Sequence, residues 1–202
     1  MGKPQKASRL IRQKSDPGKW EAFKEGDDQA YAEIYRDYIG ELYSYGKKLC
    51  KNSDIVEDAI QDVFTELWRL RRNLGQVRSI KFYLLSCLRR QLIKRLNKDR
   101  RLVLNENYLI EDNFEFVSSE QELMISDQRE LEEIGRLKKA LNTLSKRQKE
   151  VIYLKFFQNL SYQDISSMMG LNQRSTYNLV SKAIQILKEK LILWLTLLLA
   201  VF

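Results

Sequence analysis

Apolar side chains recur every three or four residues along most of this 202-residue chain, the spacing of one face of an α-helix. This apolar spacing is clear from residue 27 to 49, and it recurs in later segments that begin at capping residues. No segment alternates apolar and polar residues as a half-buried strand would. The pattern predicts an all-α protein with helices at 20–24, 27–49, 53–72, 79–98, 120–144, 145–157 and two more after residue 160.

Short polar residues mark where several of these helices begin. Asp27 is a predicted N-cap. Asp54 with Glu57, and Ser145 with Gln148, have the spacing of a capping box. The segment that follows the helix at 79–98 is acidic, has no sustained period and is predicted to be a flexible linker. These limits divide the chain into a basic arm, a helical domain, an acidic linker, a second helical domain and an apolar tail, at 1–19, 20–101, 102–129, 130–191 and 192–202.

The segment 160–191 is typical of two helices joined by a tight turn. Ser161 can cap the first helix, with Asp164 three residues later as its reciprocal partner. Gly170 falls where the chain must reverse, a position that favours a residue able to adopt positive φ. Asn172 can then cap the second helix. The spacing predicts a helix-turn-helix.

The second of these helices has an apolar face and a polar face. The apolar positions are Leu179, Ala183, Ile184, Leu187 and Leu191. The polar face carries side chains that can bind base edges and phosphates, namely Gln173, Arg174, Tyr177, Asn178, Ser181 and Lys182. The pattern favours a DNA-recognition helix, and the alternative is an ordinary helical hairpin in an α-helical core.

Charge is distributed unevenly along the chain. The formal net charge is +8, but residues 102–134 hold ten acids and one base, which leaves about +17 for the remainder. Two basic segments joined by an acidic one are typical of a protein that binds a polyanion, most often nucleic acid. The alternative is a basic protein with no nucleic-acid role.

The predicted helix at 79–98 carries a second basic face. Arg90, Lys94, Lys98 and Arg101 recur about one turn apart and can contact successive phosphates, and Arg89 and Arg95 flank this row. Its apolar side is formed largely by leucines. Near the start of the helix, Phe82 and Tyr83 could stack on unpaired bases. A solvated basic face without a ligand is the alternative.

The predicted helix at 53–72 is different in character. Around it lie acids, a glutamine and two large aromatic residues, at Asp58, Gln61, Asp62, Phe64, Glu66 and Trp68. An exposed Phe and Trp among acids make a poor DNA surface and a plausible protein-binding one. Alternatively, both rings belong to the core.

Composition excludes several kinds of chemistry. The chain has no histidine, so histidine-based catalysis and histidine metal sites are excluded, and it has no glycine-rich phosphate loop. Cys50 and Cys87 are predicted to be reduced, buried thiols of a cytoplasmic protein, and residues 1–20 do not resemble a signal peptide. We therefore expect a non-enzyme with no catalytic residue, metal, cofactor or small-molecule substrate.

The last residues, LILWLTLLLAVF, form an apolar run too short to span a bilayer. Three alternatives remain for this tail: packing against the chain's own domains, burial by a protein partner, or association with a membrane surface.

Two segments together resemble one known family. DAIQDVFTELWRLR followed by SIKFYLLSCLRRQLIKRL resembles region 2 of bacterial sigma factors, and ALNTLSKRQKEVIYLKFFQNLSYQDISSMMGLNQRSTYNLVSKAIQILKEKL resembles region 4. With these two regions and a short linker, the chain is similar to group IV, extracytoplasmic-function (ECF) sigma factors of the sigma-70 family. Its sequence is similar in character to those of Bacteroidetes-type bacteria.

This resemblance implies three sets of site residues and several partners. The residues expected to contact the clamp helices of core RNA polymerase are Asp58, Gln61, Asp62, Phe64, Leu67 and Trp68. Those expected to recognise and melt the −10 element are Arg72, Ser79, Lys81, Phe82, Tyr83, Arg89, Arg90 and Lys94. Those expected to recognise the −35 element are Gln173, Arg174, Ser175, Tyr177, Asn178, Ser181 and Lys182. The family also implies a contact with the polymerase flap, a linker that runs through the polymerase channels, and a possible membrane anti-sigma factor.

Some positions depart from the family pattern. Arg90 stands where many relatives have Asn and Lys94 where many have Asp, so the −10 preference of relatives does not carry over. Thr176 replaces the usual Val or Ile of the recognition helix. Two other functions compete with a sigma factor: a conventional helix-turn-helix regulator that binds duplex DNA without polymerase, and a protein-binding or membrane-tethered adaptor whose basic faces meet acidic lipids.

Overall fold

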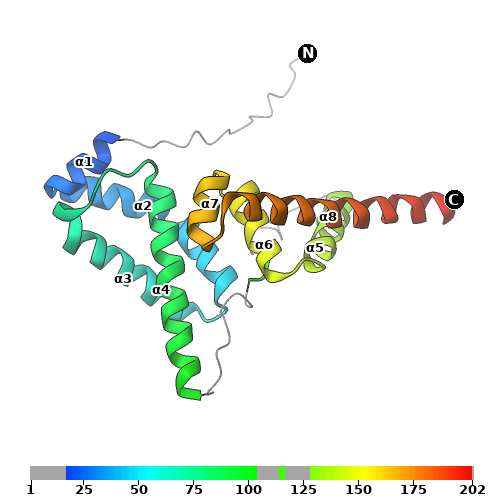
Figure 1. The fold of residues 1–202 in the computed structure, drawn as a ribbon, viewed down its shortest axis with the longest axis horizontal. Helices are drawn as coiled ribbons and strands as arrows, with labels where there is room; N and C mark the ends of the chain where they lie inside the picture. Colours follow the sequence, from blue (N-terminus) through cyan, green and yellow to red (C-terminus); the bar gives the residue numbers. More distant parts are fainter. Residues whose placement is uncertain (1–16, 104–113, 117–127, 202) are drawn as a thin grey trace, which may run out of the picture.

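The computed structural model describes residues 17–103, 114–116 and 128–201, and all the regular secondary structure in this part of the chain is helical, without a strand. Figure 1 shows two groups of helices that follow each other in sequence and lie side by side, with the C-terminal end of the long last helix extending beyond the second group. The first group is α1 (Pro17–Glu25), α2 (Asp28–Leu49), α3 (Ser53–Leu70), the 3-10 turn η1 (Arg71–Asn73) and α4 (Ile80–Val103). The second is α5 (Gln128–Asn142), α6 (Lys146–Ile152), the π-helical turn η4 (Tyr153–Phe157), α7 (Tyr162–Met169) and α8 (Gln173–Val201).

Helix starts in the first group confirm one predicted cap and correct another. The Asp27 carboxylate accepts from the backbone N–H groups of Gln29 and Ala30, as predicted. At α3 the N-cap is Asn52, whose side chain accepts from the backbone of the first turn. The predicted capping box of Asp54 with Glu57 is therefore wrong, because α3 starts two residues earlier than predicted by that box and Asp54 lies inside its first turn, where its own N–H donates to Asn52.

The first group is held by close packing of α2, α3 and α4. Gly46 of α2 permits the closest approach, since a Cβ there would lie 2.6 Å from Cγ1 of Val56 on α3. The leucine side of α4 fills the space between them, and Leu84, Leu88 and Leu92 are fully buried. This helix is longer than the predicted 79–98.

In the second group, the structure confirms the predicted capping residues. Ser145 and Gln148 form a complete capping box, and so do Ser161 and Asp164. Gly170 ends α7 in the left-handed conformation with φ +65°, as the turn requires. The predicted helix at 120–144 is present as α5 from Gln128, and residues 120–127 lie outside the described part of the chain.

The apolar tail continues α8 as a helix to Val201 rather than starting a separate segment. Side chains beyond residue 190 lie outside the described part, so the three alternatives for the tail stay open. No helix in the described segments combines the length and apolarity needed to cross a bilayer.

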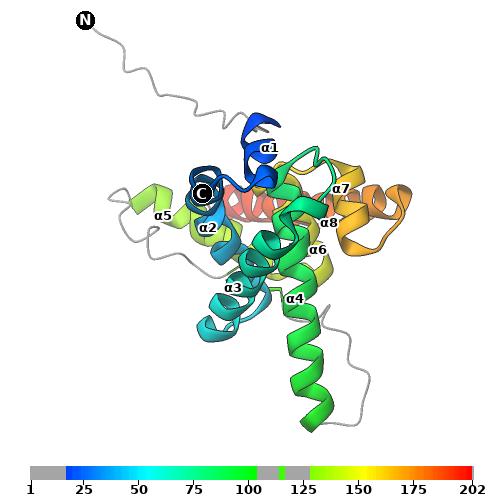
Figure 2. The ribbon, with the colours of Figure 1, turned by 90° about the vertical axis from the view of Figure 1, so that its left-hand side faces the viewer.

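The two helical groups share one hydrophobic core. α4 contacts α7, and the two lie next to each other in both Figure 1 and Figure 2. The short linker segment 114–116 also packs here: Phe114 is buried, with its ring 6.4 Å from Tyr45 of α2 and 5.6 Å from Tyr153 of η4. The fixed position of this segment is not evident from its sequence.

Candidate nucleic-acid interface

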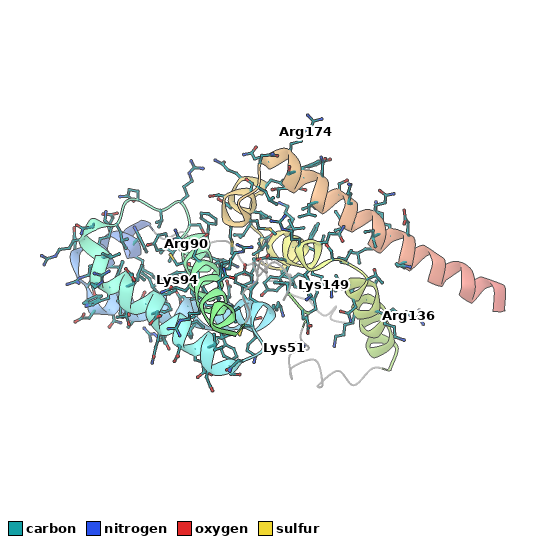
Figure 3. All side chains as sticks on the ribbon, turned by 60° about the horizontal axis from the view of Figure 1, so that its bottom comes forward. Lys51, Arg90, Lys94, Arg136, Lys149 and Arg174 are labelled. Atoms are coloured by element: carbon teal, nitrogen blue, oxygen red, sulfur yellow. The ribbon has the colours of Figure 1, made fainter. Side chains whose placement is uncertain are left out.

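The start of α8 presents the predicted recognition surface. The Asn172 side chain accepts from the backbone N–H of Ser175 at 2.7 Å, which fixes the first turn. All seven predicted side chains are exposed: Gln173, Arg174, Ser175, Tyr177, Asn178, Ser181 and Lys182. Figure 3 shows Arg174 projecting away from the body of the molecule. This helix end is free to enter a DNA groove with its polar face first.

Thr176 lies on the opposite side of the same helix. It is fully buried, and its hydroxyl donates to the backbone carbonyl of Asn172 at 3.1 Å. A Thr is tolerated at this apolar position because its hydroxyl finds a local partner within the helix.

The basic face of α4 is partly as predicted. Arg90 and Lys94 are exposed, and Figure 3 shows both on the same side of the helix. They line a groove of about 320 Å³ between α3 and α4, whose floor includes Leu67, Tyr83 and Cys87. Burial raises the pKa of Tyr83 to about 12, so its hydroxyl stays protonated at neutral pH. Lys98 and Arg101 continue α4, and their side chains lie outside the described part.

Two other bases predicted for the −10 surface are engaged inside the protein. Lys81 forms a 2.8 Å ion pair with Glu41 of α2. Arg89 is buried and forms hydrogen bonds to both carboxylate oxygens of Glu150 on α6, at 2.9 and 3.3 Å. The prediction that these side chains face DNA is wrong for this arrangement, because the helix turns them toward α2 and α6.

The loop between η1 and α4 is anchored by α1, a role that the sequence did not suggest. The indole N–H of Trp20 donates to the carbonyl of Gly75 at 3.1 Å, and the Gln76 amide donates to Glu21 at 2.6 Å. At the other end of the loop, the hydroxyl of Ser79 accepts from the backbone N–H of Phe82 at 3.2 Å. Arg72, in η1, is exposed beside this loop. Hydrogen bonds at both ends of the loop therefore fix the position of Phe82 and Tyr83, the predicted stacking residues.

The predicted protein-binding face of α3 is smaller than expected. Phe64 and Leu67 are buried, so neither can touch a partner directly here, and the core alternative holds for Phe64. Trp68 is half-buried, with the Arg71 guanidinium 4.2 Å from its ring centroid. Asp58 and Gln61 are exposed.

Arg95 of α4 connects to this acidic face. It pairs with Asp58 at 3.4 Å and also with Asp62, and the Asp62 hydrogen bond is the main cause that raises the pKa of Arg95. Asp58 and Asp62, which are predicted to contact polymerase, are thus already paired with Arg95. A basic group of polymerase would have to displace Arg95 or bind beside it.

Titratable groups elsewhere in the described residues do not form a metal centre. No group of three or more Cys, Asp or Glu side chains there could hold an ion. Cys50 is buried and Cys87 half-buried, and both are free thiols.

Two family models match the chain in the order expected. The model described as Sigma-70 region 2 matches residues 34–102, and that described as Sigma-70, region 4 matches residues 134–187. Together they cover more than half of the sequence, including α4 and the helix-turn-helix. Among curated proteins, none matches this sequence.

Two solved complexes contain a chain with a similar fold. The sigma factor RpoE from Bartonella quintana, in complex with the anti-sigma factor NepR, is 23% identical with a TM-score of 0.59, covering 81% of this chain and 97% of that chain. CnrH, in complex with the cytosolic domain of CnrY, is 16% identical with a TM-score of 0.56, covering 87% of this chain and 96% of that chain. The chain therefore belongs to the sigma-70 family, as an ECF-type sigma factor that binds core RNA polymerase and promoter DNA to begin transcription.

Proposed function

We propose that this sigma factor reads the promoter with two separate surfaces. The start of α8 reads the −35 element as duplex DNA. The groove between α3 and α4, with the loop before α4, binds the melted strand of the −10 element. The observation that carries the proposal is the common exposure of the seven polar side chains at the start of a capped α8.

The −35 surface is suited to direct readout of base edges. Arg and Asn side chains can each form two hydrogen bonds with one base in the major groove, and a good pair of this kind is worth about 1–3 kcal/mol of discrimination. Arg174 and Asn178 are one helical turn apart and both exposed. They are the side chains that we expect to specify bases, with Lys182 contacting a phosphate.

The −10 surface is suited to single-stranded DNA. Arg90 and Lys94 supply positive charge at the rim of a groove that contains the Tyr83 ring. Charge beside an aromatic ring is the arrangement that binds unpaired bases and their phosphates. The basic residues at these two positions, where many relatives have Asn and Asp, lead us to expect a −10 preference of this chain's own.

On α3, the side chains that we expect to contact polymerase are Asp58, Asp62 and Gln61, together with the half-buried Trp68. Phe64 and Leu67 are buried and support this contact indirectly, by packing α3 against the core. We also propose that the protein acts in the cytoplasm without catalytic activity of its own, and that an anti-sigma partner binds it, as the complex of RpoE with the anti-sigma factor NepR suggests.

The test is transcription by core RNA polymerase from a promoter library randomised at −35 and −10. We expect Arg174→Ala to reduce transcription from preferred promoters by about 5- to 150-fold, and to relax preference only within the −35 element. Lys188→Ala is the matched control, an exposed base farther along α8. Equal effects of both variants, or a change of preference at −10 instead, would contradict the proposed −35 reader.

A further inference from the structure

An exposed tyrosine lies in the middle of the polar face at the start of α8. Tyr177 is 58% exposed, the most of any aromatic ring in the described residues. Arg174 precedes it by three residues and Ser181 follows it by four, so all three lie on one face of the helix. A ring at this position meets the edges of base pairs when the helix enters a major groove.

The backbone that carries Tyr177 is fixed from the buried side of the helix. Its neighbour Thr176 is fully buried. The backbone N–H and the hydroxyl of Thr176 both donate to the carbonyl of Asn172, at 3.0 and 3.1 Å. The freedom that remains to Tyr177 is therefore that of its own side-chain dihedrals.

A second tyrosine, on the other helix of the motif, limits that freedom. α7 packs against α8, and Tyr162 is the first residue of α7 (Figure 1). The centroids of the Tyr162 and Tyr177 rings are 5.7 Å apart, and their planes are tilted by 52°. A ring pair of this kind favours the rotamers that make the contact by roughly 2- to 13-fold. Because a tyrosine has only two side-chain dihedrals, this contact favours one direction of the Tyr177 ring.

Tyr162 is itself held by its surroundings. The ammonium of Lys155, in η4, lies 4.6 Å from the centroid of the Tyr162 ring and donates to a backbone carbonyl at 3.2 Å. The capping box of Ser161 and Asp164 fixes the first turn of α7, where Tyr162 begins the helix. A chain of contacts thus connects η4, through Tyr162, to the ring of Tyr177 on the recognition helix.

The group in the major groove that best suits an aromatic ring is the methyl group of thymine. Thymine is the base that presents an apolar group there, and apolar side chains recognise it by direct contact. The polar edges of the other bases would lose water against the face of a ring without gaining a partner. Arg174 and Asn178, beside Tyr177, are suited instead to the hydrogen-bonding edges of guanine and adenine.

We propose that Tyr177 selects a thymine in the −35 element by contact with its methyl group, and that Tyr162 is a positioning residue for this contact. Tyr162 lies outside the recognition helix and acts on base preference through the Tyr177 ring. The inference deepens the proposed −35 function and rests on it.

The test uses the full-length protein assembled with core polymerase and duplex DNA that carries its preferred −35 element. Each thymine of that element, on either strand, is replaced in turn by deoxyuridine, which lacks the methyl group. We expect one replacement to weaken binding by about 4-fold, the value of one buried methyl-sized group. Tyr177→Ala is expected to abolish this thymine-to-deoxyuridine ratio. Tyr177→Phe is expected to keep it, because the ring makes the contact.

The positioning role of Tyr162 has its own readout. Tyr162→Ala is expected to bring the ratio close to 1, and Tyr162→Phe, which keeps the ring, to restore it. A merely structural role would instead weaken binding to both DNAs equally and leave the ratio unchanged. The matched control is Phe156→Ala, an exposed ring of η4 in the same helical group, which is expected to keep the wild-type ratio.

Three results would overturn the proposal. The first is a ratio near 1 at every thymine of the wild-type complex, or a preferred −35 element without thymine on either strand. The second is a ratio that survives Tyr177→Ala. The third is a ratio that survives Tyr162→Ala with helix content intact, which would remove the positioning role. If Arg174→Ala alters −35 preference while deoxyuridine has no effect, this inference fails and the −35 function stands; if neither has an effect, both fail.

Discussion

The recognition helix and α4 both carry rows of polar and basic side chains, but the structure uses them differently. At the start of α8 every predicted DNA-reading side chain is exposed. On α4, Arg90 and Lys94 are exposed, whereas Lys81 and Arg89 pair with acids of other helices. A basic residue on a helix is thus a DNA contact or a structural one depending on what packs against that side.

The two regions also differ in what fixes their shape. The helix-turn-helix is set by contacts between residues three or four apart, such as Ser161 with Asp164 and Asn172 with Ser175. The first helical group depends on contacts between distant segments, such as Gly46 with Val56 and Trp20 with Gly75. Substitutions that remove either a local contact or a contact between distant segments test this difference.

The largest expected effect comes from two neighbouring bases of α4. Arg89→Ala leaves the Glu150 carboxylate buried with Tyr45 alone, which we expect to cost about 3–5 kcal/mol of unfolding free energy while the two helical groups stay in contact. Arg90→Ala removes an exposed side chain and is expected to change stability by less than about 0.5 kcal/mol. Urea unfolding of both variants measures the difference. Similar small losses would mean that Glu150 reaches water and would contradict the buried pair.

A smaller effect is expected from two glycines of α2. Gly46→Ala places a methyl group 2.6 Å from Val56 and is expected to destabilise the first helical group by about 1–3 kcal/mol. Gly40→Ala, on the same helix with no atom within 4 Å, is expected to stabilise it by about 0.5–1 kcal/mol. Thermal unfolding followed by circular dichroism tests both. Two changes of the same sign would show that α2 and α3 do not approach as closely as described.

In the helix-turn-helix, the corresponding test concerns a cap. Ser161→Ala removes one half of the capping box of α7 and is expected to cost about 1 kcal/mol. Ser167→Ala, at an exposed position within the same helix, is expected to be neutral or slightly stabilising. Hydrogen exchange of the α7 amides compares the two variants, and equal protection in both would argue against local capping as the support of this motif.

The smallest effect concerns pH and the linker segment 114–116. Hydrogen bonding to Lys51 lowers the pKa of Glu115 from its ordinary value of 4.5, with Lys149 and Lys146 adding to the shift. A lowered pKa in the folded state means that the contribution of Glu115 is present above pH 4.5 and is lost as the pH falls through the folded value. We expect a small stability difference between wild type and Glu115→Gln at pH 7 that disappears at lower pH. A difference that grows on acidification would contradict this pairing.

The sequence predicted the parts of the fold that depend on near neighbours. Helix periods, the caps at Asp27, Ser145 and Ser161, and the turn at Gly170 are local features, and all are confirmed. The Asp54 cap failed because Asn52, two residues earlier, is an equally good N-cap residue, and the sequence pattern does not rank the two.

Features that depend on distant partners could not be predicted in this way. Nothing near Arg89 indicates that Glu150, 61 residues later, will face it. Phe114 lies in an acidic segment without a period, and its pocket comes from rings on two helices far apart in sequence. The burial of Phe64 follows from the packing of α3, which a helical period alone leaves undecided between core and surface.

The most direct test of the central claim is to combine the purified protein with bacterial core RNA polymerase, measure co-elution, and map the 5′ ends of transcripts made from a pool of genomic promoters. We predict a stable complex and start sites that share sequence at both −35 and −10. Tight binding to duplex DNA by a folded protein that neither associates with polymerase nor directs transcription would contradict a sigma factor and favour a conventional helix-turn-helix regulator.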